Sequence, residues 1–164
     1  MRRLIQSLYP VAVSLLALNC GILDPDSRLD ELESYREQWR AADIQHYRME
    51  FRASCFCGQE FTELVTVEVL QETIRSVTVV STGLPVEHMP IDAWLTVEEL
   101  FAAVEEAILQ DADELQVTYD LGLGYPEFVF IDREELAIDE EVGYQVFDLE
   151  VVQQMARSTS GATS

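Results

Sequence analysis

The sequence contains no lysine, so its ten basic residues are all arginine, against 31 aspartate and glutamate residues. The formal net charge is −21 at pH 7, and the acidic residues are spread along the chain. A surface this acidic repels phosphate groups, which disfavours nucleic acid as a partner. The dispersed pattern is typical of a salt-adapted, halophilic surface, since a Debye length of about 3 Å at 1 M salt screens carboxylates from one another. The alternative is an acidic patch for a cationic ligand.

Motifs that carry known catalytic chemistry are missing as well. The chain has no Gly-x-Ser-x-Gly elbow, no phosphate-binding loop and no His-Glu-x-x-His helix. Its two histidines, His46 and His88, do not stand at zinc-ligand spacing from the cysteines. We therefore expect neither enzymatic activity nor a cofactor.

A hydrophobic run long enough to span a bilayer is the third absence. Residues 4–18 follow Arg2 and Arg3 and are mostly apolar, but polar residues and a proline interrupt them. A membrane-spanning helix needs roughly 20 predominantly apolar residues, so this segment predicts a signal peptide over residues 1–19 rather than a transmembrane helix.

The end of that segment, Leu16-Ala17-Leu18-Asn19-Cys20, resembles the lipobox of bacterial lipoproteins, with Cys20 as the acylated residue. Asn19 departs from the motif, which usually has glycine, alanine or serine there. We expect a domain anchored outside the cytoplasm, whose membrane partner is reached through the N-terminal lipid. Gly21 and Ile22 carry no acidic retention signal, which favours the outer membrane where the cell has one. The alternatives are a secreted protein and an uncleaved anchor.

The remaining chain is organised as a lipidated tether over residues 20–27, one acidic domain over residues 28–152 and a disordered polar tail over residues 153–164. A helix is predicted from Asp26 or Ser27 to about residue 42, from apolar residues three to four apart. A second helix is predicted to end near residue 109 and to begin with the capping box of Thr96 and Glu99.

Alternating apolar and polar residues predict the strands. They cover residues 46–55, 62–70, 74–80, 115–119, 126–131 and 144–149. The order is helix, three strands, helix, three strands. It predicts an α+β fold with an antiparallel sheet of about six strands and both helices on one face.

Cys55 and Cys57 remain as an even pair if Cys20 carries lipid. A disulfide between them is the simplest outcome in a compartment that permits disulfides, provided that the strand bends near Gly58. Two reduced buried thiols, or redox or metal chemistry, are the alternatives.

An acidic stretch over residues 132–141 has enough oxygen ligands for calcium. Its possible ligands are Asp132, Glu134, Glu135, Asp139 and Glu140. The stretch lacks the glycine and the alternating spacing of an EF-hand, so a solvated acidic loop is the competing interpretation.

Several short motifs together resemble one known family. They are Trp39, Tyr47, Cys55-Phe-Cys57, Tyr119-Asp120, Gly124-Tyr125-Pro126, Ile131-Asp132 and residues 139–144, Asp-Glu-Glu-Val-Gly-Tyr. The chain resembles the bacterial lipoprotein family known as domain of unknown function number 6174, over roughly residues 30–149. Where that family tends to have a glycine turn this chain has Gln71-Glu72-Thr73, which leaves room for a longer or tilted loop. The resemblance implies an anchored or secreted bacterial domain and assigns no catalytic residue.

We therefore expect a non-enzymatic binding or interaction module of the cell envelope, with an envelope protein or a small ligand as its partner. A thiol redox protein that uses Cys55 and Cys57 is the first alternative. A structural lipoprotein stabilised by calcium is the second.

Overall fold

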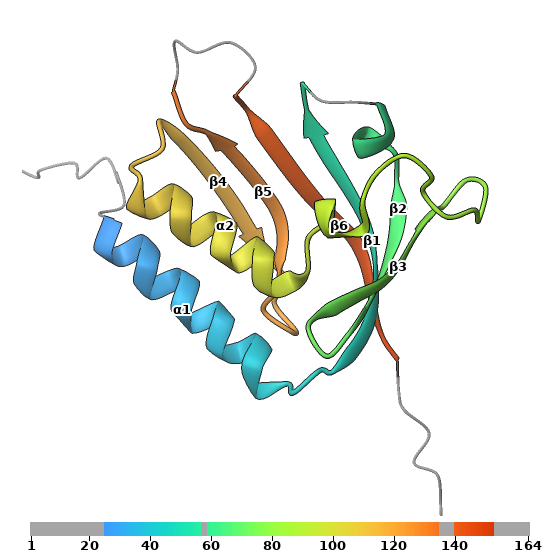
Figure 1. Ribbon diagram of the computed structural model, residues 1–164. Helices are drawn as coiled ribbons and strands as arrows, with labels where there is room; N and C mark the ends of the chain where they lie inside the picture. Colours follow the sequence, from blue (N-terminus) through green and yellow to red (C-terminus); the bar gives the residue numbers. More distant parts are fainter. Residues whose placement is uncertain (1–24, 57–58, 135–139, 153–164) are drawn as a thin grey trace, which may run out of the picture.

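The computed structural model describes residues 25–56, 59–134 and 140–152. Its elements are α1 (Pro25–Ala41), β1 (His46–Cys55), the 3-10 helix η1 (Gln59–Thr62), β2 (Val65–Leu70), β3 (Thr73–Val79), the 3-10 helix η2 (Ile91–Ala93), α2 (Val97–Leu109), β4 (Glu114–Tyr119), β5 (Pro126–Asp132) and β6 (Val142–Val151). The predicted order of helix, three strands, helix, three strands is confirmed. Figure 1 shows both α-helices on the same side of the sheet, as expected.

The six strands form one antiparallel sheet in the order β3-β2-β1-β6-β5-β4. The first three strands are neighbours in sequence and in space, and so are the last three. These two meanders meet where β1 pairs with β6. The α+β class is therefore confirmed, with β3 and β4 as the two edges of the sheet.

The alternation of side chains along β1 separates a buried face of the sheet from an open one. Tyr47, Met49, Phe51 and Ala53 are each only 1% exposed, whereas the residues between them lie on the opposite face. β2 follows the same pattern with three buried valines. Because side chains alternate with a period of two, this register places all the large apolar groups under the helices and loops.

The two α-helices cover only one half of the buried face (Figure 1). Tyr35 of α1 stacks on Tyr119 of β4 with 4.2 Å between ring centroids, and α2 packs on β4 and β5. On the other side, η1 packs on β1, and η2, which belongs to the connection over residues 80–96, packs on β3. We refer to β4, β5 and β6 as the helix-covered half and to β1, β2 and β3 as the loop-covered half.

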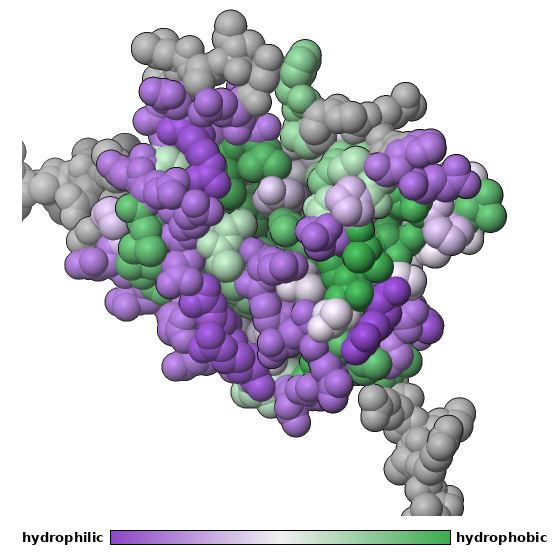
Figure 2. Space-filling model, viewed as in Figure 1, coloured by the Kyte–Doolittle hydropathy of each residue, from purple (hydrophilic) through white to green (hydrophobic). Residues whose placement is uncertain are grey.

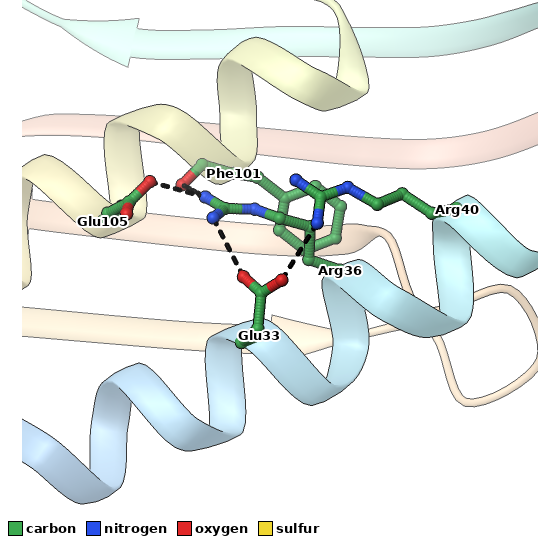
Figure 3. Close-up of polar contacts among 5 residues, drawn as sticks. All are labelled: Glu33, Arg36, Arg40, Phe101 and Glu105. Carbon is green, nitrogen blue, oxygen red and sulfur yellow. Dashed lines mark hydrogen bonds and ion pairs between the residues drawn. The ribbon is translucent and has the colours of Figure 1, made fainter.

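Arg36 joins α1 to α2 (Figure 3). Its guanidinium donates to the Phe101 carbonyl at 3.2 Å, to the Glu105 carboxylate at 2.8 Å and to the Glu33 carboxylate at 3.1 Å. The guanidinium carbon also lies 5.6 Å from the centroid of the Phe101 ring, which is a cation–π contact. Since the Arg36 side chain is only 12% exposed, water screens these contacts less than it screens surface ion pairs.

Two glycines of the motifs described above lie where a Cβ atom would force neighbouring atoms to move. Gly124 has a φ of +86°, and a Cβ there would lie 2.6 Å from the Tyr35 carbonyl oxygen. A Cβ on Gly143 of β6 would overlap the Ser54 hydroxyl on β1. These glycines are therefore explained by close packing of α1 on the β4–β5 turn and of β1 on β6.

The turn between β2 and β3 is short, although it contains no glycine. Only Gln71 and Glu72 separate the strands, and Leu70 pairs with Thr73. Both turn residues have positive φ, 52° and 57°, as a two-residue hairpin turn of this kind requires. The irregularity lies in β3 instead, where a bulge leaves Arg75 without an opposite residue.

Two strands differ from the sequence prediction by more than one residue at an end, whereas the other four agree to within one residue. The strand predicted from residue 62 begins at Val65, because residues 59–62 form η1. The last strand extends over Val142–Val151 rather than residues 144–149, since β6 pairs along nearly all of the long strand β1.

Candidate functional site

A groove lies between β3 and residues 85–94 in the loop-covered half. Its volume is about 310 Å³, and apolar side chains line most of it, including Val77, Val86, Met89 and Ile91. Arg75 is the charged residue among those that line it. Figure 2 shows hydrophobic surface between α2 and β3, with hydrophilic residues around it. A concave, mainly apolar site with few polar groups is the usual form of a small-molecule or peptide site.

Trp94 also lines this groove and is 1% exposed. Its ring stacks on Phe61 at 5.0 Å and meets the Phe51 ring edge-on at 6.3 Å. Its indole nitrogen has no hydrogen-bond partner within the described part of the chain. A buried donor without a partner costs free energy, so a water molecule or a polar group of a molecule bound in the groove would stabilise it.

The outer edge of β3 forms one wall of the groove. The Val79 amide donates to the Leu84 carbonyl at 2.9 Å, and the Val86 amide donates to the Val77 carbonyl at 3.2 Å. These bonds flank an isolated antiparallel bridge between Thr78 and Pro85. Among the described residues no strand pairs with the outer edge of β3 before Val77, so residues 73–76 present an open edge.

The groove lining ends at Trp94, and residues 95–96 connect it directly to α2. The Thr96 hydroxyl accepts from the Glu99 amide at 3.2 Å, and the Glu99 carboxylate accepts from the Thr96 amide at 2.7 Å. The predicted capping box is therefore confirmed. Thr96 is buried, so both bonds are protected from water.

A polar cluster at the start of α2 ties the sheet to both helices. The Tyr47 hydroxyl accepts from the Val97 amide at 2.9 Å and donates to the Glu98 carboxylate at 3.4 Å. The other Glu98 oxygen accepts from the Trp39 indole at 2.9 Å. Burial, and next the negative charge of Glu98, raise the pKa of Tyr47 well above its usual value, so its hydroxyl remains a donor.

A second hollow, of about 390 Å³, lies beside this cluster and is acidic. Asp43, Glu72 and Glu98 line it together with Arg40, which forms an ion pair with Glu33 at 2.9 Å. Within the described ranges, no three His, Cys, Asp or Glu side chains are grouped so that they could hold a metal ion. The hollow is therefore a polar surface feature next to the helix-covered half.

The cysteine predictions fall mainly on residues that the structure does not describe. Cys20 and Cys57 lie outside the described residues, and Cys55 ends β1 in a half-buried position. Lipidation of Cys20 and a Cys55–Cys57 disulfide therefore stay predictions.

The calcium prediction is also only partly covered. Glu135 and Asp139 lie outside the described residues, while Glu134 and Glu140 are exposed. Asp132 is the last residue of β5, and its carboxylate accepts from the Glu134 amide at 3.1 Å. This hydrogen bond of the Asp132 carboxylate belongs to a local turn. Calcium binding stays a prediction.

The two histidines lie apart from each other and have different surroundings. His46 lies 2.8 Å from the Glu68 carboxylate on the neighbouring strand, a hydrogen bond that, with Arg48, holds the pKa of Glu68 below its usual value. His88 is exposed and lines a hollow on the other side of residues 84–86.

Sequence reasoning missed the groove altogether. The connecting loop over residues 81–95 has neither a helical nor a strand period, and no motif there gives Trp94 a role. The available signal was the cluster of apolar residues in that loop, Leu84, Val86, Met89 and Ile91, which is unusual for a solvated connection.

The described part of the chain has no helix long and apolar enough to cross a membrane. A comparison with protein families matches residues 31–151 to the Family of unknown function (DUF6174), and the chain therefore belongs to this family. Comparison with curated proteins gave no match, and comparison with solved structures gave none.

Proposed function

We propose that this member of the DUF6174 family is a non-enzymatic binding module of the cell envelope. In this proposal Cys20 carries the lipid anchor, and Cys55 and Cys57 form a structural disulfide. The groove along β3 receives an apolar ligand or an apolar part of an envelope protein. The single observation that carries the binding role is the open, mainly apolar groove floored by Trp94.

The short chain between Cys20 and α1 limits how far the domain can lie from the membrane. Cys20 and Pro25, where α1 begins, are five residues apart. An extended chain spans at most about 3.6 Å per residue, so the start of α1 would lie within about 18 Å of the acylated residue. In Figure 1 the start of α1 and strand β3 are on opposite sides of the molecule. The groove would therefore be presented away from the lipid surface.

The character of the groove supports binding rather than catalysis. Most of its lining side chains are apolar, and Arg75 is the titratable residue among them. General acid–base or nucleophilic catalysis needs a pair of positioned reactive groups, whereas recognition needs shape and a few polar contacts.

The anchor is tested by the intact mass of the protein extracted from membranes of its native host. We expect a chain that begins at Cys20 and carries acyl groups, and we expect Cys20→Ser to move the protein out of the membrane fraction. Alkylation of Cys55 and Cys57 only after reduction would support the disulfide. An unlipidated chain in the soluble fraction would overturn the anchor and leave the binding proposal to be judged by the next experiment.

The groove is tested with Nile red, a neutral dye whose fluorescence rises and shifts to the blue in apolar surroundings. We expect the wild-type protein to bind it and Ile91→Asp to lose binding, because a carboxylate would lie in the groove. Leu121→Asp is the matched control, since Leu121 is an exposed leucine on the β4–β5 turn. Equal loss in both variants, or no binding by the wild-type protein, would contradict a ligand site in the groove.

A further inference from the structure

The groove borders the edge of the sheet and not only its face. Four consecutive residues of β3, Arg75–Thr78 in sequence, line it. A hollow that touched only one face of a strand would be lined by alternate residues, because neighbouring side chains point to opposite faces. The backbone edge of β3 is therefore itself part of the site.

The chain already uses this edge as a template for strand pairing. Residues 84–86 bond to Val77 and Val79, and then the chain leaves the edge and passes over the groove to η2. The open edge at residues 73–76 continues the line of this pairing. An incoming strand would thus extend a ladder that the protein has begun with its own chain.

On this basis we propose that the occupant of the groove is an extended peptide segment of a partner protein, which adds as a short strand to the outer edge of β3. The proposal rests on the binding role proposed above and names its ligand. Backbone amides and carbonyls of the peptide pair with residues 73–76, and one apolar side chain enters the hollow beside Val77, Ile91 and Trp94. Strand addition of this kind draws affinity from main-chain hydrogen bonds and specificity from side-chain pockets.

The charge of the chain favours a neutral or basic peptide over a second copy of this chain. Each copy carries a formal charge of −21, so two copies would repel each other over the whole surface. The bulge at Arg75 also shortens the regular part of the edge, which limits pairing to a few residues and opposes extended self-association.

The experiment uses a capped seven-residue peptide, Arg-Val-Arg-Leu-Arg-Val-Arg, whose apolar side chains lie on one face of a strand. The matched control is the same peptide with residues two to six methylated on the backbone nitrogen, so that both edges of the strand lose their amide donors. It keeps every side chain and loses the amide donors of these residues. Binding is measured by displacement of Nile red and by amide hydrogen exchange of residues 73–77.

We expect the first peptide to displace the dye and to slow exchange at residues 73–77, and we expect the methylated peptide to bind at least about tenfold more weakly. Equal binding of the two peptides would overturn strand addition and leave the groove as a side-chain site. If neither peptide binds while the dye still binds, the proposal of a peptide ligand would be overturned and the proposed binding function would be preserved. A dimer detected by light scattering that excludes the peptide would assign the edge to a second copy and would also overturn the proposal.

Discussion

The two tryptophans of the chain lie in the two halves of the molecule and have opposite surroundings. Trp39 is in α1, and its indole nitrogen donates to Glu98. Trp94 is in the loop-covered half, equally buried, and its indole nitrogen has no partner in the described structure. Trp39 lines the acidic hollow of about 390 Å³, whereas Trp94 lines the mainly apolar groove of about 310 Å³.

The segments that pack on the buried face of the sheet also differ between the two halves. Over the helix-covered half, Arg36 and the stacked pair of Tyr35 and Tyr119 close the space between helices and sheet. Over the loop-covered half, the connection from β3 to α2 has only a short pairing with β3 at residues 84–86 and the single turn η2, and it leaves exposed apolar residues such as Leu84 and Ile91. Two helices can satisfy their own backbones while they pack on a sheet, whereas an irregular segment fills space less completely. We infer that stability is concentrated in the first half and recognition in the second.

The largest expected effect is the loss of a core ring under the helices. Phe101→Ala should lower the free energy of unfolding by about 3–5 kcal/mol, because it leaves a cavity and removes the cation–π contact with Arg36. Val86→Ala, in the half-buried groove wall, should cost only about 1 kcal/mol. Urea denaturation of both variants measures the contrast. Similar losses in the two variants would show that the groove wall is ordinary core.

The next prediction compares the tryptophans directly. Trp39→Phe should cost about 1–3 kcal/mol, because the Glu98 carboxylate loses a buried donor. Trp94→Phe should change stability by less than about 1 kcal/mol, because the lost ring contacts are offset by removal of a buried donor that has no hydrogen-bond partner among the described residues. Both substitutions remove a similar volume, so each serves as the control for the other in urea titrations. A larger loss for Trp94→Phe than for Trp39→Phe would contradict this difference between the two indole groups.

A smaller effect is expected at Thr96, where the loop-covered half joins α2. Thr96→Ala should destabilise the domain by about 1 kcal/mol, because the Glu99 amide loses its acceptor. Thr96→Ser keeps the hydroxyl and should retain most of that stability. Thermal melting of the three proteins, together with Nile red binding, would show whether the cap also holds the groove wall in place. Equal melting temperatures for alanine and serine would contradict the role of the hydroxyl.

The last prediction concerns an effect that is confined to alkaline pH and comes from a buried tyrosine. Burial, and next the negative charge of Asp120, raise the pKa of Tyr125 to about 12, above its unfolded value of 10.0. The folded state therefore keeps a proton that the unfolded state loses, so this contribution is complete below pH 10 and is lost as the pH rises towards 12. Tyr125→Phe should reduce the dependence of stability on pH in that window, measured by urea titration at pH 9 and 11. An unchanged slope would show that Tyr125 ionises equally in both states.

Much of the fold could be predicted because its signals are local. Alternation in residues 46–55 predicted β1 with its observed bounds, and the Thr96–Glu99 pair predicted the start of α2. The groove could not be predicted in the same way, because residues 84–94 have neither a helical nor a strand period. The residues that face them lie on β3 and are identified only once β3 is known to be an edge strand.

The sequence by itself determined where the helices and strands form, which faces are apolar and how acidic the surface is, since these depend on residues a few positions apart. The tertiary structure alone decided that β1 pairs with β6, that both helices cover the same half and that the buried Trp94 indole nitrogen has no hydrogen-bond partner among the described residues. Each of these depends on contacts between residues far apart in the chain. No local pattern encodes such contacts, because they arise only when all the apolar faces are buried together.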